Sequence, residues 1–196
     1  HTVSSLAGED TAVQSIAVEA NKDILSPLPV RTALLDGNYE GANKEAVQVL
    51  VEKAEGYAIN VPPKAKEVVG IRIDANARVA NRFQFIVGEG AELEVQFYVT
   101  GSGDALTNVS YLIEYDVKEA GKVVVKKVNL LPEHVQHIEH RYTKLEEKAD
   151  VEYINIEIGG SENILNYYHD LVGQESRMIH DIAYLGNKEQ KFDISM

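Results

Sequence analysis

The stretch "AELEVQFYV", Ala91 to Val99, alternates apolar and polar side chains with a period of two. One face of the pattern is apolar and consists of Ala91, Leu93, Val95, Phe97 and Val99. The intervening residues include Glu92, Glu94 and Gln96. Because successive side chains of a β-strand point to opposite faces, this stretch predicts a strand with one buried face.

The same alternation continues along the chain in "RFQFIV", "NVSYLIEY", "KVVVKKV", "ADVEYINIEI" and "RMIHDIAYL". These segments are rich in Val, Ile and Tyr, which favour strands, and no long helix separates them, so an all-β architecture is predicted. Upstream, "NKEAVQVLVEKAEG" predicts one short helix, with Asn43 as its N-cap and Gly56 as its end. We therefore expect a 1–54 N-terminal segment with one short helix and a 55–196 β core.

The strands also repeat. Ala91, Ala149 and Ser176 each precede an apolar residue by two positions after a polar turn, and a weaker copy begins at Ala120. The steps between these residues are 27 to 29 residues long. Such a period indicates a solenoid, and two strands per repeat fit one coil of a flattened parallel β-helix. An antiparallel sandwich is the alternative, but the regular spacing favours the β-helix.

The amino-acid composition limits the classes of function that this chain can have. The formal net charge is −12, and an acidic surface disfavours binding to nucleic acid or anionic lipid. No apolar run is long enough for a membrane span and no signal peptide is visible, so a cytoplasmic location is expected.

The 196 residues contain no cysteine, which excludes thiolate ligands and cysteine nucleophiles from this sequence. "GSGDALTN" lacks the ending of a Walker loop, so ATP hydrolysis would require a partner.

Two His-Asp pairs, His169-Asp170 and His180-Asp181, lie eleven residues apart in "YYHDLVGQESRMIHDIAYLG". Neighbours on a strand point to opposite faces, so neither dipeptide can hold one ion. Aligning the repeats places His180 on the buried face, where neighbouring coils are expected to supply its hydrogen-bond partners. We interpret both pairs as architecture, with metal or proton chemistry as the alternative.

Three further histidines in "EHVQHIEHR" are the metal candidates: His134, His137 and His140. On a helix they would share one side and offer a two-histidine site for Zn or Fe. On a strand, His134 and His140 share one face and His137 takes the other. A strand with a solvated edge is the favoured interpretation, and a metal-binding β-barrel is a distant alternative. No catalytic or cofactor-binding residue is assigned.

Several segments in order resemble the SufB/SufD family of iron–sulfur cluster assembly proteins over about residues 56–196. They are "GYAINVPPKAKEVVGIRI", "FIVGEGAELEVQFYVT", "LEEKADVEYINIEIGG" and "LVGQESRMIHDIAYLGNKEQKFDISM". The Gly159-Gly160 pair and the final "NKEQKFDISM" are the most specific parts. The resemblance implies a right-handed parallel β-helix, a SufBD-type core over 55–196, that serves as a non-catalytic scaffold of the cytosolic Suf system.

The resemblance also implies partners. Members pair through their β-helices, so a SufB-type subunit or a homodimer is expected. A SufC-type ABC ATPase binds a helical region that follows the β-helix and is absent from this sequence. No cofactor is expected to bind stably, although a transient iron–sulfur cluster shared with a partner chain fits the family. "TKLEE", Thr143 to Glu147, has no cysteine where SufB proteins are expected to accept sulfur, which favours a SufD-like member or a divergent member of the family.

A β-helical carbohydrate-active enzyme is the alternative from another class. It would use Asp170, Asp181 and Asp193, and paired carboxylates cleave glycosides only within several ångströms of each other. These three acids lie in different repeats, and the chain has no Trp for stacking on sugars. The scaffold interpretation is therefore favoured.

Overall fold

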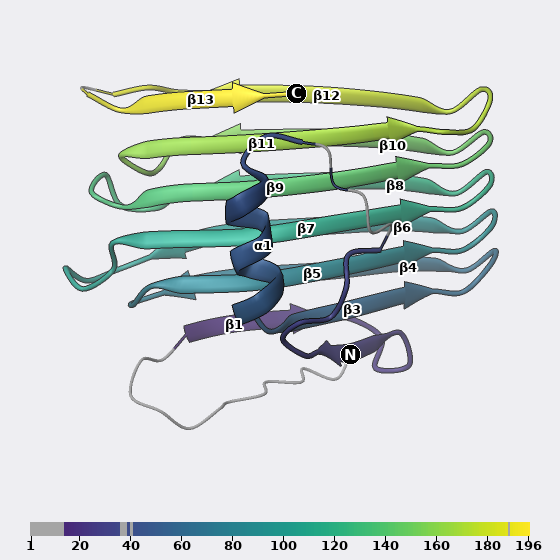
Figure 1. Cartoon of the computed structure of the whole chain (residues 1–196), viewed down its shortest axis with the longest axis horizontal. Helices are drawn as coiled ribbons and strands as arrows, with labels where there is room; N and C mark the ends of the chain where they lie inside the picture. Colours follow the sequence, from purple (N-terminus) through teal and green to yellow (C-terminus); the bar gives the residue numbers. More distant parts are fainter. Residues whose placement is uncertain (1–13, 36–38, 40, 188) are drawn as a thin grey trace.

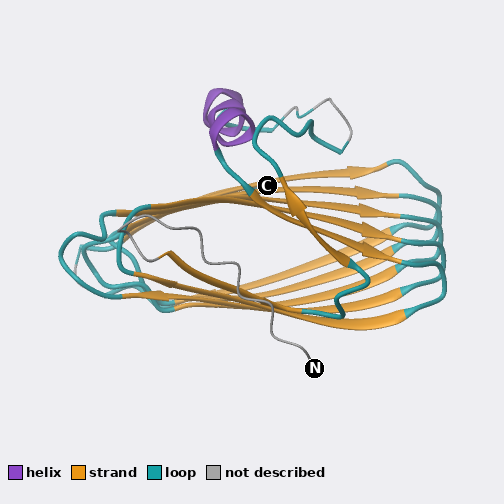
Figure 2. Ribbon diagram, turned by 90° about the horizontal axis from the view of Figure 1, so that it is seen from below, coloured by secondary structure: helices purple, strands orange, loops and turns teal. Residues whose placement is uncertain are grey.

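The structure is a computed structural model that describes residues 14–35, 39, 41–187 and 189–196. Its strands form two facing sheets that stack as flattened coils (Figure 1). Seen along the stack, the sheets enclose a narrow interior, and the helix lies outside one of them (Figure 2). The fold is thus the predicted β-solenoid.

Sheet A contains six of the described strands, in the order β1-β4-β6-β8-β10-β12. They are β1 (Gln14–Glu19), β4 (Lys66–Ala75), β6 (Glu92–Gly101), β8 (Lys122–Asn129), β10 (Asp150–Glu157) and β12 (Arg177–Tyr184). Sheet B contains seven, in the order β13-β11-β9-β7-β5-β3-β2. They are β2 (Leu25–Leu28), β3 (Gly56–Val61), β5 (Val79–Val87), β7 (Asn108–Val117), β9 (Gln136–Leu145), β11 (Glu162–Leu171) and β13 (Lys191–Ser195).

From β3 onward the chain alternates between the two sheets, and every strand pair is parallel. This pattern excludes the antiparallel sandwich. Within the described part of the chain, only β1 and β2 pair in the antiparallel direction, on β4 and β3, and they cover the edge of the stack nearest the N-terminus. The sequence patterns missed both of these strands. At the other end, β12 and β13 each have one neighbouring strand among the described residues.

One corner of each coil is a turn whose third residue has a positive φ. These residues are Lys64, Gly90, Ala120, Lys148 and Glu175. The register pairs Lys122 with Glu92, so Gly121 and not Ala120 corresponds to Ala91. The repeat predicted at Ala120 was therefore one residue out of register. Ala120 and Gly121 are both small and both lie at this turn. Only the backbone conformation shows that Ala120 is the corner residue and that Gly121 is the first residue that points inward.

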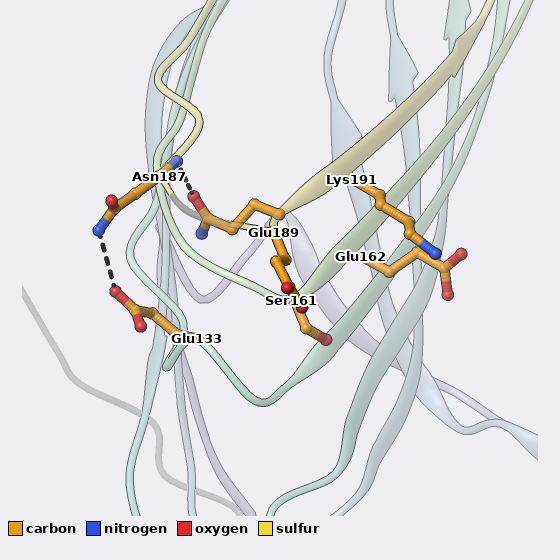
Figure 3. Close-up of a pocket in the computed structure, with 7 residues that line it drawn as sticks. Glu133, Ser161, Glu162, Asn187, Glu189 and Lys191 are labelled. Atoms are coloured by element: carbon orange, nitrogen blue, oxygen red, sulfur yellow. Dashed lines mark hydrogen bonds between the residues drawn. The ribbon is translucent and has the colours of Figure 1, made fainter.

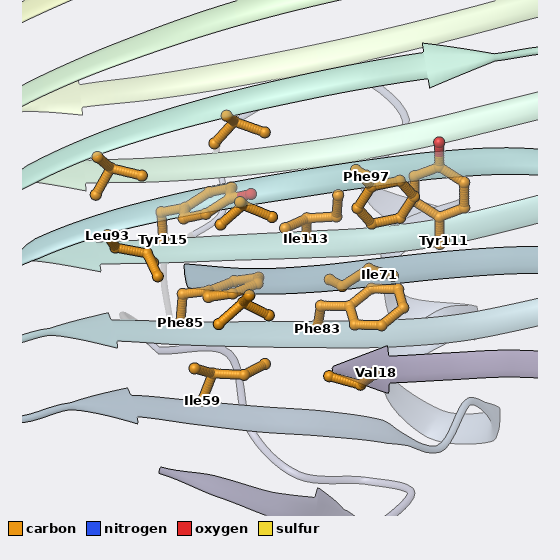
Figure 4. Packing of buried hydrophobic residues seen from close by; sticks show 14 of the residues in the cluster. Val18, Ile59, Ile71, Phe83, Phe85, Leu93, Phe97, Tyr111, Ile113 and Tyr115 are labelled. Carbon is orange, nitrogen blue, oxygen red and sulfur yellow. The ribbon is translucent and has the colours of Figure 1, made fainter. Parts of the chain in front are cut away.

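Apolar side chains from both sheets fill the interior of the first coils (Figure 4). The register aligns Val95 between Val69 and Val125 on successive strands, as the alternation predicted. Across the interior, the Phe83 and Phe97 rings meet edge to face with centroids 5.5 Å apart. Burying side chains of this size contributes about 1.5–3 kcal/mol each, so this column stabilises the stack.

The helix α1 (Lys44–Lys53) lies on the outer face of sheet B, where Val47 and Leu50 pack with Leu112 and Tyr142. It begins where the sequence predicted, but Asn43 makes no side-chain cap and instead has φ 57°. It also ends before Gly56, because the chain turns extended at Ala54 to enter β3. Among the described residues, no helix is long and apolar enough to cross a membrane.

Residues 31–35, the N-terminal arm, cross the same outer face of sheet B and are held by three buried polar side chains. Glu114 accepts a hydrogen bond from the backbone N–H of Leu35 at 2.8 Å. Arg82 donates to the carbonyl of Thr32 at 2.6 Å and to Glu114 at 3.0 Å. Gln84 donates to Ala33 and to Glu114. The arm is therefore fixed by charge-assisted hydrogen bonds in a buried setting.

Candidate functional site

The interior of the solenoid changes from apolar to polar as the stack approaches its C-terminal end. Inward positions of β8 to β11 carry a group that we call the interior polar network: Lys127, Asn129, His137, Glu139, Arg141, Asn155, Glu157 and Asn163. All are at most 1% exposed. Charged side chains are almost never fully buried without partners, so this set marks the most unusual chemistry of the described chain.

Ion pairs hold the centre of the network. The Nζ of Lys127 donates to Glu139 and, at 2.5 Å, to Oε1 of Glu157. Arg141 donates to Oε1 of Glu139 through Nε at 2.9 Å and Nη2 at 2.5 Å. Burial raises the pKa of Glu139, but Arg141 and Lys127 outweigh it and hold that pKa well below its ordinary value. The carboxylate therefore stays charged within the protein interior.

Aromatic rings close the network on the side of the last coils. The guanidinium of Arg141 lies 4.3 Å from the ring centroid of Tyr153 and 4.6 Å from that of Tyr167. The hydroxyl of Tyr167 accepts a hydrogen bond from Asn155 at 2.9 Å. Burial raises the pKa of both tyrosines, so both remain protonated at neutral pH. These contacts restrain the guanidinium in one orientation.

His137, one of the metal candidates, belongs to this network and uses both ring nitrogens. Nδ1 lies 3.0 Å from Oδ1 of Asn163, and Nε2 lies 2.8 Å from the hydroxyl of Tyr111. Asn163 donates its own amide to Gly159, so its oxygen faces the imidazole, and Nδ2 of Asn129 lies 3.1 Å from the same Nδ1. Burial, followed by Lys127, lowers the pKa of His137 to about 4. The ring is thus neutral and fully engaged.

The other two metal candidates lie elsewhere. His140 faces the outer side of sheet B, where it is buried and lies 3.5 Å from Nδ2 of Asn166. His134 is exposed in the turn before β9 and is outside the strand. The prediction of a solvated edge was wrong for His137 and His140, because both side chains are fully buried, His137 inside the stack and His140 on the outer side of sheet B. Among the described residues, no three or more metal-ligating side chains converge.

His169 and His180 do converge, although each adjacent aspartate points away. The register aligns His180 with Tyr153, which confirms that it faces the interior. His169 reaches the same space from β11, and the two ring centroids are 5.9 Å apart. Neither ring has a hydrogen-bond partner among the described residues, so the expected partners from neighbouring coils are not there. Alternation along one strand separates each histidine from its neighbouring aspartate, but it does not show contacts between the two sheets.

The three aspartates proposed for sugar cleavage do not form a site. Asp181 lies on the outer face of sheet A, whereas Asp170 and Asp193 lie on the outer face of sheet B. Asp193 pairs with Ile164, which is six positions from Asp170 along β11. Six positions of strand span about 20 Å, far beyond the separation of paired catalytic carboxylates.

A shallow depression of about 580 Å³ lies at the corner between β11 and β13 (Figure 3). Its walls include Glu133, Ser161, Glu162, Asn187 and Lys191. The side chain of Asn187 donates to Glu133 at 3.3 Å, and its backbone N–H donates to the side chain of Gln190 at 2.7 Å. Asn187 and Glu133 are thus paired with each other at an exposed corner, so they give no argument for acid–base chemistry in the depression.

The sequence contained a signal for the interior polar network that the strand analysis did not use. In "KVVVKKVN" the inward positions include Lys127 and Asn129, and in "QHIEHRYTKL" they include His137, Glu139 and Arg141. Polar residues at positions that the alternation assigns to the core indicate a buried network. The alternation does not reveal which residues pair, because the partners come from different coils.

These features define a β-solenoid with a polar and charged interior in its later coils. Residues 71–196 match the family described as SUF system FeS cluster assembly, SufBD core domain. The chain therefore belongs to the SufBD core family of iron–sulfur cluster assembly. No curated protein matches it. No solved structure matches it.

Proposed function

We propose that this chain is a non-catalytic scaffold subunit of a Suf system, which pairs with a SufB-type subunit or with a second copy of itself. The match of residues 71–196 to the SufBD core domain is the observation that carries the proposal. The scattered positions of the aspartates support a scaffold over a β-helical carbohydrate-active enzyme.

The edge of β12 supports pairing. In a parallel ladder, the N–H and C=O of one residue bond to the same neighbouring strand. Arg177 donates to Ala149, just before β10, and Leu185 donates to Glu157 at its end, so the alternate residues of β12 direct their backbone groups away from β10. Tyr184 and Leu185 are 61% and 66% exposed at this edge. An exposed strand edge is a template for another chain, which makes β12 the proposed pairing edge.

The lack of cysteine in these 196 residues supports a SufD-like role, in which a partner supplies the thiolates for a transient cluster. The lack of a Walker loop supports a separate SufC-type ATPase as the source of ATP hydrolysis. We propose a cytoplasmic location for the complex. In this scheme the cluster is cargo and the chain is a rigid platform.

Anaerobic co-purification of the full native protein with co-expressed SufB-type and SufC-type proteins tests the proposal. Tyr184→Lys and Leu185→Lys place charges at the edge of β12 and are expected to abolish pairing, because lysine blocks strand addition. Val68→Lys is the matched control, since Val68 is 59% exposed on a strand far from that edge.

A stable complex that both edge variants lose and the control keeps would support the proposal. A wild-type protein that stays monomeric and ignores both partners would overturn it. Pairing that survives both edge variants would move the interface away from β12.

A further inference from the structure

His169 and His180 face each other inside the last coil of the solenoid. His169 comes from β11 in sheet B and His180 from β12 in sheet A. Their ring centroids lie 5.9 Å apart with the ring planes at 72°. The Tyr167 ring lies beneath both, with centroids 4.7 Å from His180 and 6.4 Å from His169. Two sheets thus deliver two imidazoles to one space.

All four ring nitrogens of this pair are buried, and within the described chain none has a hydrogen-bond partner. A buried nitrogen without a partner costs about 1–3 kcal/mol. His137, one coil away, has partners on both nitrogens. The fold therefore satisfies one interior histidine completely and leaves this pair unsatisfied, which an aromatic packing role alone does not explain.

The charge state of the pair suits a metal ion. Burial, followed by the positive charge of Arg141, lowers the pKa of His169 to about 4 and that of His180 to about 3. Both rings are neutral at neutral pH, and the neutral imidazole is the form that binds a metal. Arg141 is paired with Glu139 and packs against the Tyr167 ring, so its charge is partly neutralised.

The distance between the two imidazole rings is also compatible with a shared metal ion. Two imidazoles that share an ion at the usual metal–nitrogen distance of about 2.0–2.1 Å have ring centroids at most about 6.4 Å apart. The observed separation of 5.9 Å lies within this limit.

We propose that His169 and His180 form a two-imidazole site for one divalent first-row transition metal ion, with water completing its coordination. Imidazole nitrogens suit Zn²⁺, Fe²⁺, Co²⁺ and Ni²⁺, and no hard-cation ligand such as a carboxylate belongs to the pair. The proposal rests on the two side chains alone and goes beyond the scaffold role.

Titration of the full, tag-free protein with Co²⁺ under anaerobic conditions tests the site through equilibrium dialysis and visible absorption. One Co²⁺ per chain is expected. His169→Phe and His180→Phe keep an aromatic ring against the tyrosines and remove the nitrogens. Each is expected to weaken binding at least tenfold while leaving the metal-free protein at least as stable. His134→Ala removes an exposed histidine and is expected to change nothing.

Proton NMR of the wild-type protein provides a measurement that needs no variant. Among the six histidines, those whose ring signals Co²⁺ shifts most are expected to be His169 and His180. The proposal is overturned if Co²⁺ fails to bind at millimolar concentration, if both Phe variants bind as wild type does, or if only His134→Ala loses binding.

Discussion

The ion pairs in the solenoid interior predict that Lys127→Met is strongly destabilising. Lys127 is 1% exposed and is the hydrogen-bond donor to Glu157. Methionine has a similar length and fills the space, so the change removes the charge and leaves a buried carboxylate without its partner. Removing one member of a buried ion pair costs about 3–5 kcal/mol, which is our expected loss of unfolding free energy.

The neighbouring residue offers a matched control. Lys126 lies on the same strand but faces outward, where it pairs with Glu94 at 3.1 Å and its side chain is 51% exposed. A surface pair of this kind contributes about 0.2–1 kcal/mol, so Lys126→Met should be nearly neutral. Equilibrium urea unfolding followed by circular dichroism and tyrosine fluorescence measures both losses under the same conditions.

A second substitution separates charge from packing. Glu157→Gln in the Lys127→Met background removes the uncompensated carboxylate and should restore about 1–3 kcal/mol. If Lys127→Met costs no more than Lys126→Met, or if Glu157→Gln restores nothing, the interior polar network does not stabilise the fold as argued.

Three further predictions concern pH, the N-terminal arm and a close backbone approach. Lowering the pH from about 6.5 to about 4 should remove up to ~3.4 kcal/mol of unfolding free energy through His137, because the unfolded chain binds a proton that the folded ring does not. Burial also lowers the pKa of His140, His169 and His180, so the total loss measured by urea unfolding should exceed the share of His137. Glu114→Gln should loosen the arm and speed tryptic cleavage after the exposed Arg31 about tenfold, because buried Arg82 loses its charged partner. Gly159→Ala should lower the unfolding free energy by at least ~2 kcal/mol in thermal or urea unfolding, because a Cβ there would lie 2.1 Å from the backbone nitrogen of Leu131.

Each of these predictions has a control within the chain. His134→Ala should leave the pH dependence unchanged, and a stability that stays constant from pH 6.5 to 4 would contradict the argument. Glu146→Gln removes a partly exposed carboxylate and should not affect the arm. Gly70→Ala should be tolerated, because its nearest contact is a side-chain atom at 3.5 Å. Equal effects of the two glycine substitutions would refute the close-approach argument.

Much of the fold was predictable because local chemistry determines it. The alternation in Ala91–Val99 sets which side chains face the interior, and the structure buries every residue of that apolar face. The repeat of turn and strand gave the coil and, with it, the inward orientation of His180. The alternation and the repeat are both periodic. Such a period can be read from the sequence because backbone geometry determines the direction of successive side chains.

What the sequence could not determine depends on contacts between coils and between sheets. Alternation shows that Lys127, Glu139 and Arg141 face inward, but their pairing requires the packing of β8 across the interior from β9 and its register on β10. The meeting of His169 and His180 likewise requires the spacing of the two sheets. The sequence determines which face of its strand a side chain occupies. The stacking of the coils determines which other side chain it contacts, because residues far apart in the sequence become neighbours only in the folded stack.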